Sequence, residues 1–310
     1  MRSPRMNDLS LIFGALGPIF ALILLGLGLR RLEFPGDGFW PAAERFTYFI
    51  LFPALLVHRL ALARLGDYAV GSVAVGIAAQ LLGMTALVYA LRPWLQVDGP
   101  AFSSVYQGVI RFNTYVGLAV VLAVFQAEGG AVAALVMAIM IPLINVLCVL
   151  VLNMHAGGSA TICGVLRGLL ANPLILACLI GIGLNVGGIG LPWGSAAVLE
   201  ILARAALPLG LLAVGAGLRV TGLSRPGLLA TASGLKLLVL PALAGVLCWL
   251  VEPGRLETAV LVTFAALPGA STAYILARQL GGDAPLIAAI VTVETALAML
   301  TLPAVLLWVV

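Results

Sequence analysis

Apolar residues run along the chain in ten long segments that are separated by short polar or basic links. Most segments are close to the roughly 20 residues that a helix needs to cross the hydrocarbon of a bilayer. Backbone groups in lipid need partners within the protein, so helices are the expected structure. The ten predicted transmembrane helices of this all-α integral membrane protein cover residues 10–29, 40–57, 69–91, 101–125, 130–152, 169–187, 196–218, 227–250, 257–277 and 285–309.

The two halves of the chain resemble each other at a constant shift of 155 residues. The segment "GPIFALILLGLGL" (17–29) aligns without gaps with "NPLILACLIGIGL" (172–184), and the same shift pairs Asn113 with Pro268. The repeats, residues 1–155 and 165–310, then hold five helices each. An odd number makes the second repeat enter the membrane from the opposite side, which is typical of secondary transporters.

The fourth and ninth segments are interrupted at positions that the repeat makes equivalent. Pro268 lacks a backbone N–H and Gly269 loosens the chain, while Asn113 and Thr114 precede Gly117 in the fourth segment. We therefore expect both helices to break near the midplane and to cross. Half-helix N-termini suit a carboxylate. The predicted substrate-binding residues are Arg111, Asn113, Thr114, Gly117, Pro268, Gly269, Ser271 and Thr272.

Two simpler interpretations of these residues stay open. Both helices can be kinked without binding a ligand, their polar side chains satisfying freed backbone groups. Arg111 can equally extend its guanidinium to the interface with the headgroups, rather than act as counter-ion to an anionic substrate.

Composition supports lipid as the solvent. The 310 residues are 63% hydrophobic and 9% charged, against about 25% charged in a soluble domain. The net charge of +4 includes no basic run that would indicate nucleic acid. The four cysteines show no CxxC or Cys/His spacing, so we expect no disulfide, no metal and no cofactor.

Three polar residues lie deep inside predicted helices, where polar groups are costly. Lys236 either extends to the interface or is a buried cation that replaces a metal ion. Glu294 either pairs structurally with Lys236 or Arg111, or exchanges a proton during a transport cycle. Asn145 is expected to form a hydrogen bond between helices. Coupling to protons or to sodium therefore stays open.

The sequence resembles the auxin efflux carrier family in its bacterial branch. The resemblance is carried by "RFNTYVGLAVVLAVFQAEGGAVAAL" (111–135), "NPLILACLIGIGLN" (172–185), "RAALPLGLLAVGAGL" (204–218) and "ALPGASTAYILARQLGGD" (266–283). It implies a fold related to the bile acid:sodium symporters, with a panel of helices 1, 2, 6 and 7 and a mobile unit of helices 3–5 and 8–10. Plant relatives carry a proline in both broken helices, so a gentler break is expected near Asn113.

The resemblance also implies a function. It implies a small organic anion, such as malonate, malate or an auxin-like acid, that binds where helices 4 and 9 cross and moves by alternating access. A channel or an intramembrane enzyme is the alternative, but no HExxH motif or carboxylate cluster supports an enzyme. A homodimer is not excluded.

Basic residues predict the orientation in the inner (plasma) membrane. Placing both termini outside puts more arginines on the inner side than on the outer side. The inner set is Arg30, Arg31, Arg45, Arg92, Arg167, Arg219, Arg225 and Arg278.

Overall fold

Helices form all the regular secondary structure of the residues that the computed structural model describes, which are 6–36, 38–157, 161–219 and 225–309. The predicted all-α fold class is thereby confirmed. Within this part of the chain, six helical stretches are long and apolar enough to cross a membrane. Four of them are single helices: α1 (Met6–Arg31), α4 (Val70–Leu95), α9 (Ser195–Gly217) and α14 (Ala284–Val309).

Two long helical rods, each made of three consecutive elements, contain one turn of π-helix in the middle. In both, a proline follows the π turn by two residues, Pro53 in the first rod and Pro241 in the second. Proline removes a backbone donor and its ring collides with the preceding turn, so a local change of helix type is expected there. The first rod consists of α2 (Phe39–Phe46), η1 (Thr47–Leu51) and α3 (Phe52–Ala61), and the second of α10 (Pro226–Gly234), η3 (Leu235–Val239) and α11 (Leu240–Val251).

The predicted fourth segment is broken. Helix α5 (Gly99–Ile110) begins at Asp98, whose carboxylate accepts a hydrogen bond from the N–H of Ala101, and three non-helical residues separate it from α6 (Thr114–His155). Helix α6 is itself divided at Gln126, where φ is 56° and ψ is −147°. This division matches the boundary between the fourth and fifth predicted segments.

The predicted ninth segment is broken over a longer stretch. Six residues separate α12 (Arg255–Ala265) from α13 (Thr272–Leu280). The shorter break before α6 agrees with the absence of a proline there. The remaining elements are η2 (Leu65–Asp67), α7 (Ile162–Leu170) and α8 (Pro173–Val186).

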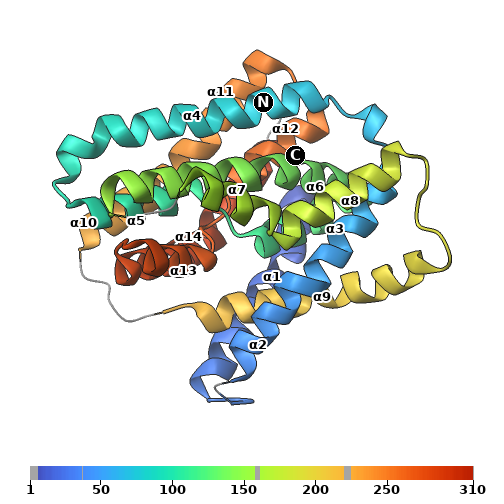
Figure 1. Cartoon of the computed structure of the whole chain (residues 1–310), viewed down its shortest axis with the longest axis horizontal. Helices are drawn as coiled ribbons and strands as arrows, with labels where there is room; N and C mark the ends of the chain where they lie inside the picture. The colour runs from blue at the N-terminus through green and yellow to red at the C-terminus, as the bar shows by residue number, and fades with distance from the viewer. Residues whose placement is uncertain (1–5, 37, 158–160, 220–224, 310) are drawn as a thin grey trace.

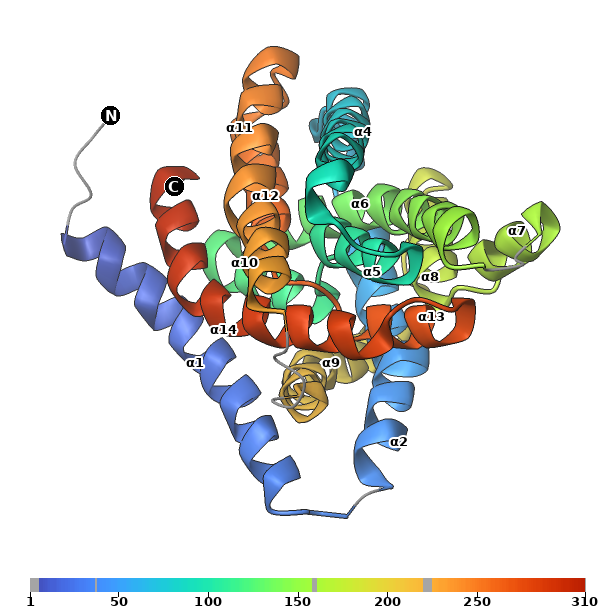
Figure 2. The ribbon, with the colours of Figure 1, turned by 90° about the vertical axis from the view of Figure 1, so that its left-hand side faces the viewer.

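One group of helices consists of α1, α3, α8 and α9, which pack closely on one another. Figure 2 shows α1 and the α2–α3 rod as two arms that meet at one end, with α9 between them. Glycines allow the close contacts. A Cβ atom on Gly26 of α1 would collide with the carbonyl of Leu212 in α9, and one on Gly181 of α8 would collide with Leu60 in α3. Gly26 and Gly181 are related by the same 155-residue shift as Asn113 and Pro268.

The other helices form a second group around α5, α6 and α14. Helix α4 runs beside α11 along one edge of the molecule (Figure 1). The links between helices lie at the two opposite ends of the molecule, and hydrogen bonds hold them there. At one end the side-chain amide of Asn185 donates to the carbonyl oxygens of Leu60 and Ala61. At the other end the N–H of Asp283 donates to the carbonyl of Pro100.

Candidate functional site

The breaks in the two interrupted segments meet in the interior. The backbone N–H of Asn113 donates to the carbonyl oxygen of Pro268 at 2.9 Å, so the hydrogen bond joins two residues that lie 155 positions apart in the sequence. The side chain of Asn113 is 2% exposed, and its Oδ1 accepts from the N–H groups of Tyr115 and Val116. Asn113 therefore caps α6 and ties the start of that helix to the other break.

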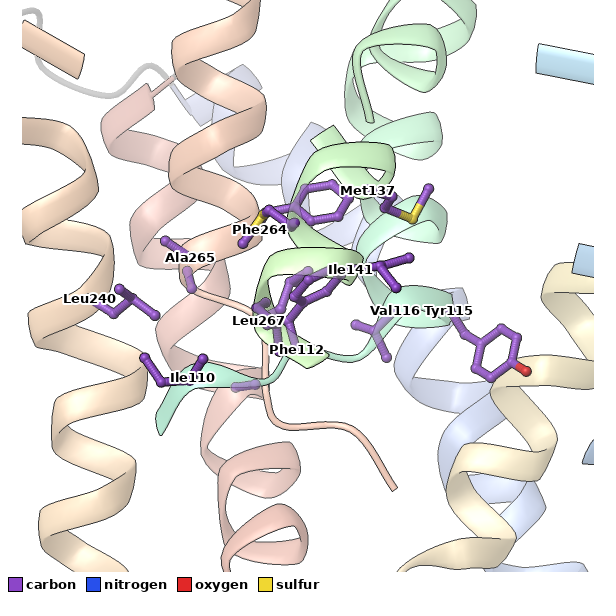
Figure 3. Packing of buried hydrophobic residues seen from close by; sticks show 14 of the residues in the cluster. Ile110, Phe112, Tyr115, Val116, Met137, Ile141, Leu240, Phe264, Ala265 and Leu267 are labelled. Atoms are coloured by element: carbon purple, nitrogen blue, oxygen red, sulfur yellow. The ribbon is translucent and has the colours of Figure 1, made fainter. Parts of the chain in front are cut away.

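Small and aromatic residues pack the crossing (Figure 3). A Cβ atom on Gly117 would overlap the side chain of Leu267 and approach the ring of Phe264, so a larger residue would force these buried side chains to shift. The rings of Phe112 and Phe264 lie edge to face, with centroids 5.2 Å apart. Pro268 and Gly269 are buried at the crossing and do not line the cavity described next. Gly117 likewise packs the crossing.

A cavity of about 110 Å³ lies beside the crossing. Both breaks contribute to it, and so do α6 and the start of α8. Its polar lining includes an arginine, three asparagines, two threonines, a serine and two tyrosines. The residues that line it are Tyr48, Arg111, Phe112, Asn113, Thr114, Tyr115, Ile141, Ile144, Asn145, Asn172, Leu174, Ala270, Ser271 and Thr272.

Arg111 supplies a positive charge to this cavity. Its Nη1 donates to Oδ1 of Asn145 at 3.2 Å, and its Nη2 donates to Oγ1 of Thr272 at 3.4 Å. Both acceptors are neutral, and within the described ranges no carboxylate lies within ion-pair distance of this guanidinium. Arg111 is therefore held in place by neutral groups and keeps donors that can bind an anion.

The start of α13 adds backbone donors. The N–H of Gly269 donates to Glu294, and those of Ala273 and Tyr274 donate to carbonyls of the same turn. Among the described residues, no hydrogen bond uses the N–H groups of Ala270, Ser271 and Thr272, all of which line the cavity. Three free N–H groups at the positive end of a helix favour a negatively charged ligand.

The cavity opens towards one end of the molecule. Tyr48, Arg111, Asn145 and Thr272 also line a wider cavity of about 590 Å³, whose outer wall includes Arg45 and Gln279. The carboxylate of Glu44 faces this wider space, and the hydroxyl of Ser271 donates to its Oε1 at 3.4 Å. The start of α13 thus contacts a carboxylate of the protein itself, which comes from α2.

The opposite side of the cavity is closed by aromatic packing. The rings of Tyr115 and Phe52 lie edge to face, with centroids 4.9 Å apart. A Cβ atom on Gly210 of α9 would collide with the Tyr115 ring, and Figure 3 shows that ring pointing away from the crossing towards α9. The first group of helices therefore packs directly on α6 at this side.

The two predicted deep charges lie behind the crossing, outside the cavity. Glu294 of α14 is fully buried, and its Oε2 accepts from the N–H of Gly269 at 2.8 Å. Lys236 of η3 is 1% exposed. Lys236 does not extend to the surface, because burial of its side chain is almost complete.

The structure thus separates the predicted site residues into three places. Those at the cavity are Arg111, Asn113, Thr114, Asn145, Ser271 and Thr272; those within the crossing are Gly117, Pro268 and Gly269; and those behind it are Glu294 and Lys236. The sequence analysis did not identify Tyr48, Glu44 or Asn172. Of these three residues, Glu44 is the one that the sequence could have revealed, because it is a carboxylate inside an apolar segment.

Cys148 lies beside Arg111, behind the cavity lining. Cys148, Cys178 and Cys248 are buried free thiols. The side chain of Cys163 lies outside the described residues.

Comparison with known proteins gives two findings. A family model described as "Membrane transport protein" matches residues 11–306. A protein of Methanothermobacter thermautotrophicus named "Uncharacterized transporter" is 27% identical over 290 residues, which cover 92% of this chain and 94% of the relative.

Proposed function

Because this multi-pass membrane protein belongs to the membrane transport protein family, the auxin efflux carriers that its sequence resembles, we propose that it is a secondary transporter for a small organic carboxylate. The carboxylate binds in the cavity beside the crossing and moves by alternating access. The observation that carries this proposal is Arg111, a cation at the cavity whose hydrogen-bond acceptors among the described residues, Asn145 and Thr272, are neutral.

The surroundings of Arg111 support a carboxylate. A carboxylate has two oxygens, each able to accept more than one hydrogen bond. The guanidinium of Arg111 and the free N–H groups of Ala270, Ser271 and Thr272 supply donors from two directions. Tyr48 and Asn172 add polar groups to the wall.

The size of the cavity favours a compact cargo. A volume of about 110 Å³ suits a short carboxylate such as malonate or malate better than an indole acid. Larger acids would need the wider cavity that opens beside Arg45 and Gln279.

We further propose that the chain forms two inverted repeats of five transmembrane helices. Support comes from the equivalent breaks joined by Asn113 and Pro268, and from the equivalent glycines. Gly26 brings α1 onto α9, and Gly181 brings α8 onto α3, which is the exchange of partners that an inverted repeat predicts.

Alternating access then follows from the two groups of helices. The group of α1, α3, α8 and α9 acts as the fixed panel, and the group around α5, α6 and α14 acts as the mobile unit. The wider cavity lies at the end that carries Arg45 and Arg278, which the positive-inside rule assigns to the cytoplasm. On this assignment the conformation is open inwards, both termini are outside, and Tyr115 closes the outer side against Phe52.

Binding and counterflow test the proposal. Malonate, malate and indole-3-acetate are screened for an increase in the melting temperature of the purified protein, because a ligand of the folded state stabilises it. The ligands that bind are then tested for counterflow exchange in proteoliposomes. Saturable exchange supports a carrier, whereas a linear, ohmic flux would establish a channel.

Arg111→Gln is the decisive variant. Loss of a charge-assisted hydrogen bond weakens binding by about 10- to 100-fold, since such bonds contribute roughly 1.5–3 kcal/mol. Arg204→Gln is the matched control, because Arg204 is exposed and pairs with Glu200 one turn away in α9. Wild-type affinity in a folded Arg111→Gln protein would place the cargo elsewhere.

A further inference from the structure

Glu294 connects the crossing to a second polar region. Its Oε2 holds the N–H of Gly269 inside the break between α12 and α13, while its Oε1 has no hydrogen-bond partner among the described residues. Glu294 is fully buried. A buried carboxylate with one unpaired oxygen is costly, so a proton or a bound molecule is expected to satisfy it.

Lys236 is the charged residue that faces Glu294. The two groups interact electrostatically, but no ion pair joins them at 4.0 Å or less in the described structure. The other elements packed against α14 are α1, α5, α10, α12 and α13. Within the described residues these elements bring no further charged side chain to Glu294.

Other buried polar groups lie on the helices around this pair. Gln107 of α5 leaves both atoms of its side-chain amide without a partner in the described ranges, and Ser233 of α10 and Gln80 of α4 each leave one atom unpaired. Helix α5 packs against α4, α10, η3 and α14, so it adjoins every element that carries one of these groups. Figure 3 shows Ile110, one turn after Gln107, beside Leu240, which lies one turn after Lys236.

Unpaired buried donors and acceptors each cost about 1–3 kcal/mol, so their concentration on the helices around Lys236 and Glu294 needs an explanation. Ordered water that bridges Lys236, Gln107 and Glu294 would satisfy them. Apolar packing would have been cheaper than an incompletely bonded network if the region were purely structural.

We propose that Glu294, Lys236 and Gln107 form the proton-coupling site of the protein, and that Glu294 exchanges one proton with water in each transport cycle. The proposal rests on the transport function proposed above and specifies its coupling ion. In the loading step an O–H bond forms at Oε1 of Glu294, with the proton taken from hydronium, which becomes water. In the release step that bond breaks and the proton returns to water on the other side.

The hydrogen bond to Gly269 links this exchange to the cargo. A charged carboxylate accepts a stronger hydrogen bond than a neutral carboxyl group. Protonation of Glu294 therefore weakens its hold on the N–H of Gly269, which adjoins the free N–H groups of Ala270 and Ser271 at the cavity. The protonation state thus alters the backbone that we propose binds the carboxylate.

The first test needs no cargo. Infrared spectra of the reconstituted protein are recorded over the pH range in which it stays folded. We expect a carboxylic acid band that appears as the pH falls, is absent in Glu294→Gln and is retained in Glu257→Gln. Glu257 is the matched control, because it is also a buried carboxylate but lies at the far end of α12 and bonds to the N–H of Ala69.

Lys236→Met provides an independent variant if Glu294→Gln fails to fold. Methionine keeps the length of the side chain and removes its charge, so the Glu294 band should persist to higher pH than in the wild type. An unchanged titration in Lys236→Met, or the absence of any titrating band from Glu294, would overturn the proposal.

The second test separates coupling from transport with radiolabelled malonate as the probe. Glu294→Gln mimics the protonated state, so it should still exchange malonate saturably at equal pH, with an altered affinity, and should lose the accumulation driven by a pH gradient. Accumulation that persists in this variant would overturn the proton site. Failure of malonate counterflow in the wild type would count against the proposed transport of malonate, whereas the infrared titration still decides whether Glu294 exchanges a proton.

Discussion

Residues at the crossing have one of two roles: they support the fold, or they line the cavity. Asn113 caps α6 with its side-chain oxygen and joins the opposite break through its backbone N–H. Arg111 lies two residues earlier and lines the cavity, where its guanidinium donates to Asn145 and Thr272. Two residues close together in the sequence therefore lie in different surroundings: Asn113 supports the crossing, and Arg111 presents its charge to the cavity.

Asn113→Asp distinguishes capping from anion binding. Aspartate is as good a cap as asparagine, so Asn113→Asp should keep the hydrogen bonds to the start of α6, whereas Asn113→Ala should lose them at a cost of about 1 kcal/mol of stability. The added negative charge at the cavity should weaken carboxylate binding by roughly tenfold or more, as expected for like charges at partly screened sites. Calorimetry measures both effects. Equal carboxylate affinity in Asn113→Asp would place the anion away from the start of α6.

At the scale of elements, the crossing depends on close contact between two broken helices. Gly117 places α6 against the loop that contains Leu267, and Asn113 holds the same loop by its backbone. The π turns before Pro53 and Pro241 show another response to proline, in which the rod continues without separating into two helices. Whether a proline breaks a helix therefore depends on what packs around it.

Gly117→Ala tests the contact at the crossing. The new methyl group would overlap Leu267 and approach the ring of Phe264, both of which are buried, so we expect a loss of about 1–3 kcal/mol of stability. Gly183→Ala is the matched control, because a Cβ atom at Gly183 of α8 meets no atom within 4 Å. Thermal unfolding compares the two variants. Equal melting temperatures would show that the crossing is looser than described.

At the scale of the whole molecule, the two groups of helices meet around the cavity and leave it open at one end. Arg45 and Gln279 stand at that opening, and the packing of Tyr115 on Phe52 and Gly210 closes the other end. Under the orientation proposed above, the open end faces the cytoplasm, because it carries basic residues such as Arg45. Under the proposed mechanism, this conformation is one end state of an alternating-access cycle.

Thr272→Cys reports the direction of the opening. In a background without the four native cysteines, a membrane-impermeant thiol reagent should label this position from the cytoplasmic side, because Thr272 lines both the inner cavity and the wider one. A bound carboxylate should slow the labelling. Rapid labelling from the outer side alone would reverse the assigned orientation or conformation.

The sequence by itself determined the class of the fold and the position of the breaks. Apolar segments of membrane-spanning length specify helices because lipid offers the backbone no partners. Proline and polar residues at a shared 155-residue shift located both interruptions, since the missing donor and the capping side chain act locally.

Only the tertiary structure decided which of these polar residues share a cavity. Arg111 meets Asn145 and Thr272, which are 34 and 161 residues away, and Ser271 meets Glu44 across 227 residues. Such contacts depend on how two broken helices cross and on which face each presents to α2, and periodicity within one segment carries no information on either. For the same reason, the sequence identified Gly117, Pro268 and Gly269 as residues of the breaks, but only their tertiary contacts show that they pack the crossing.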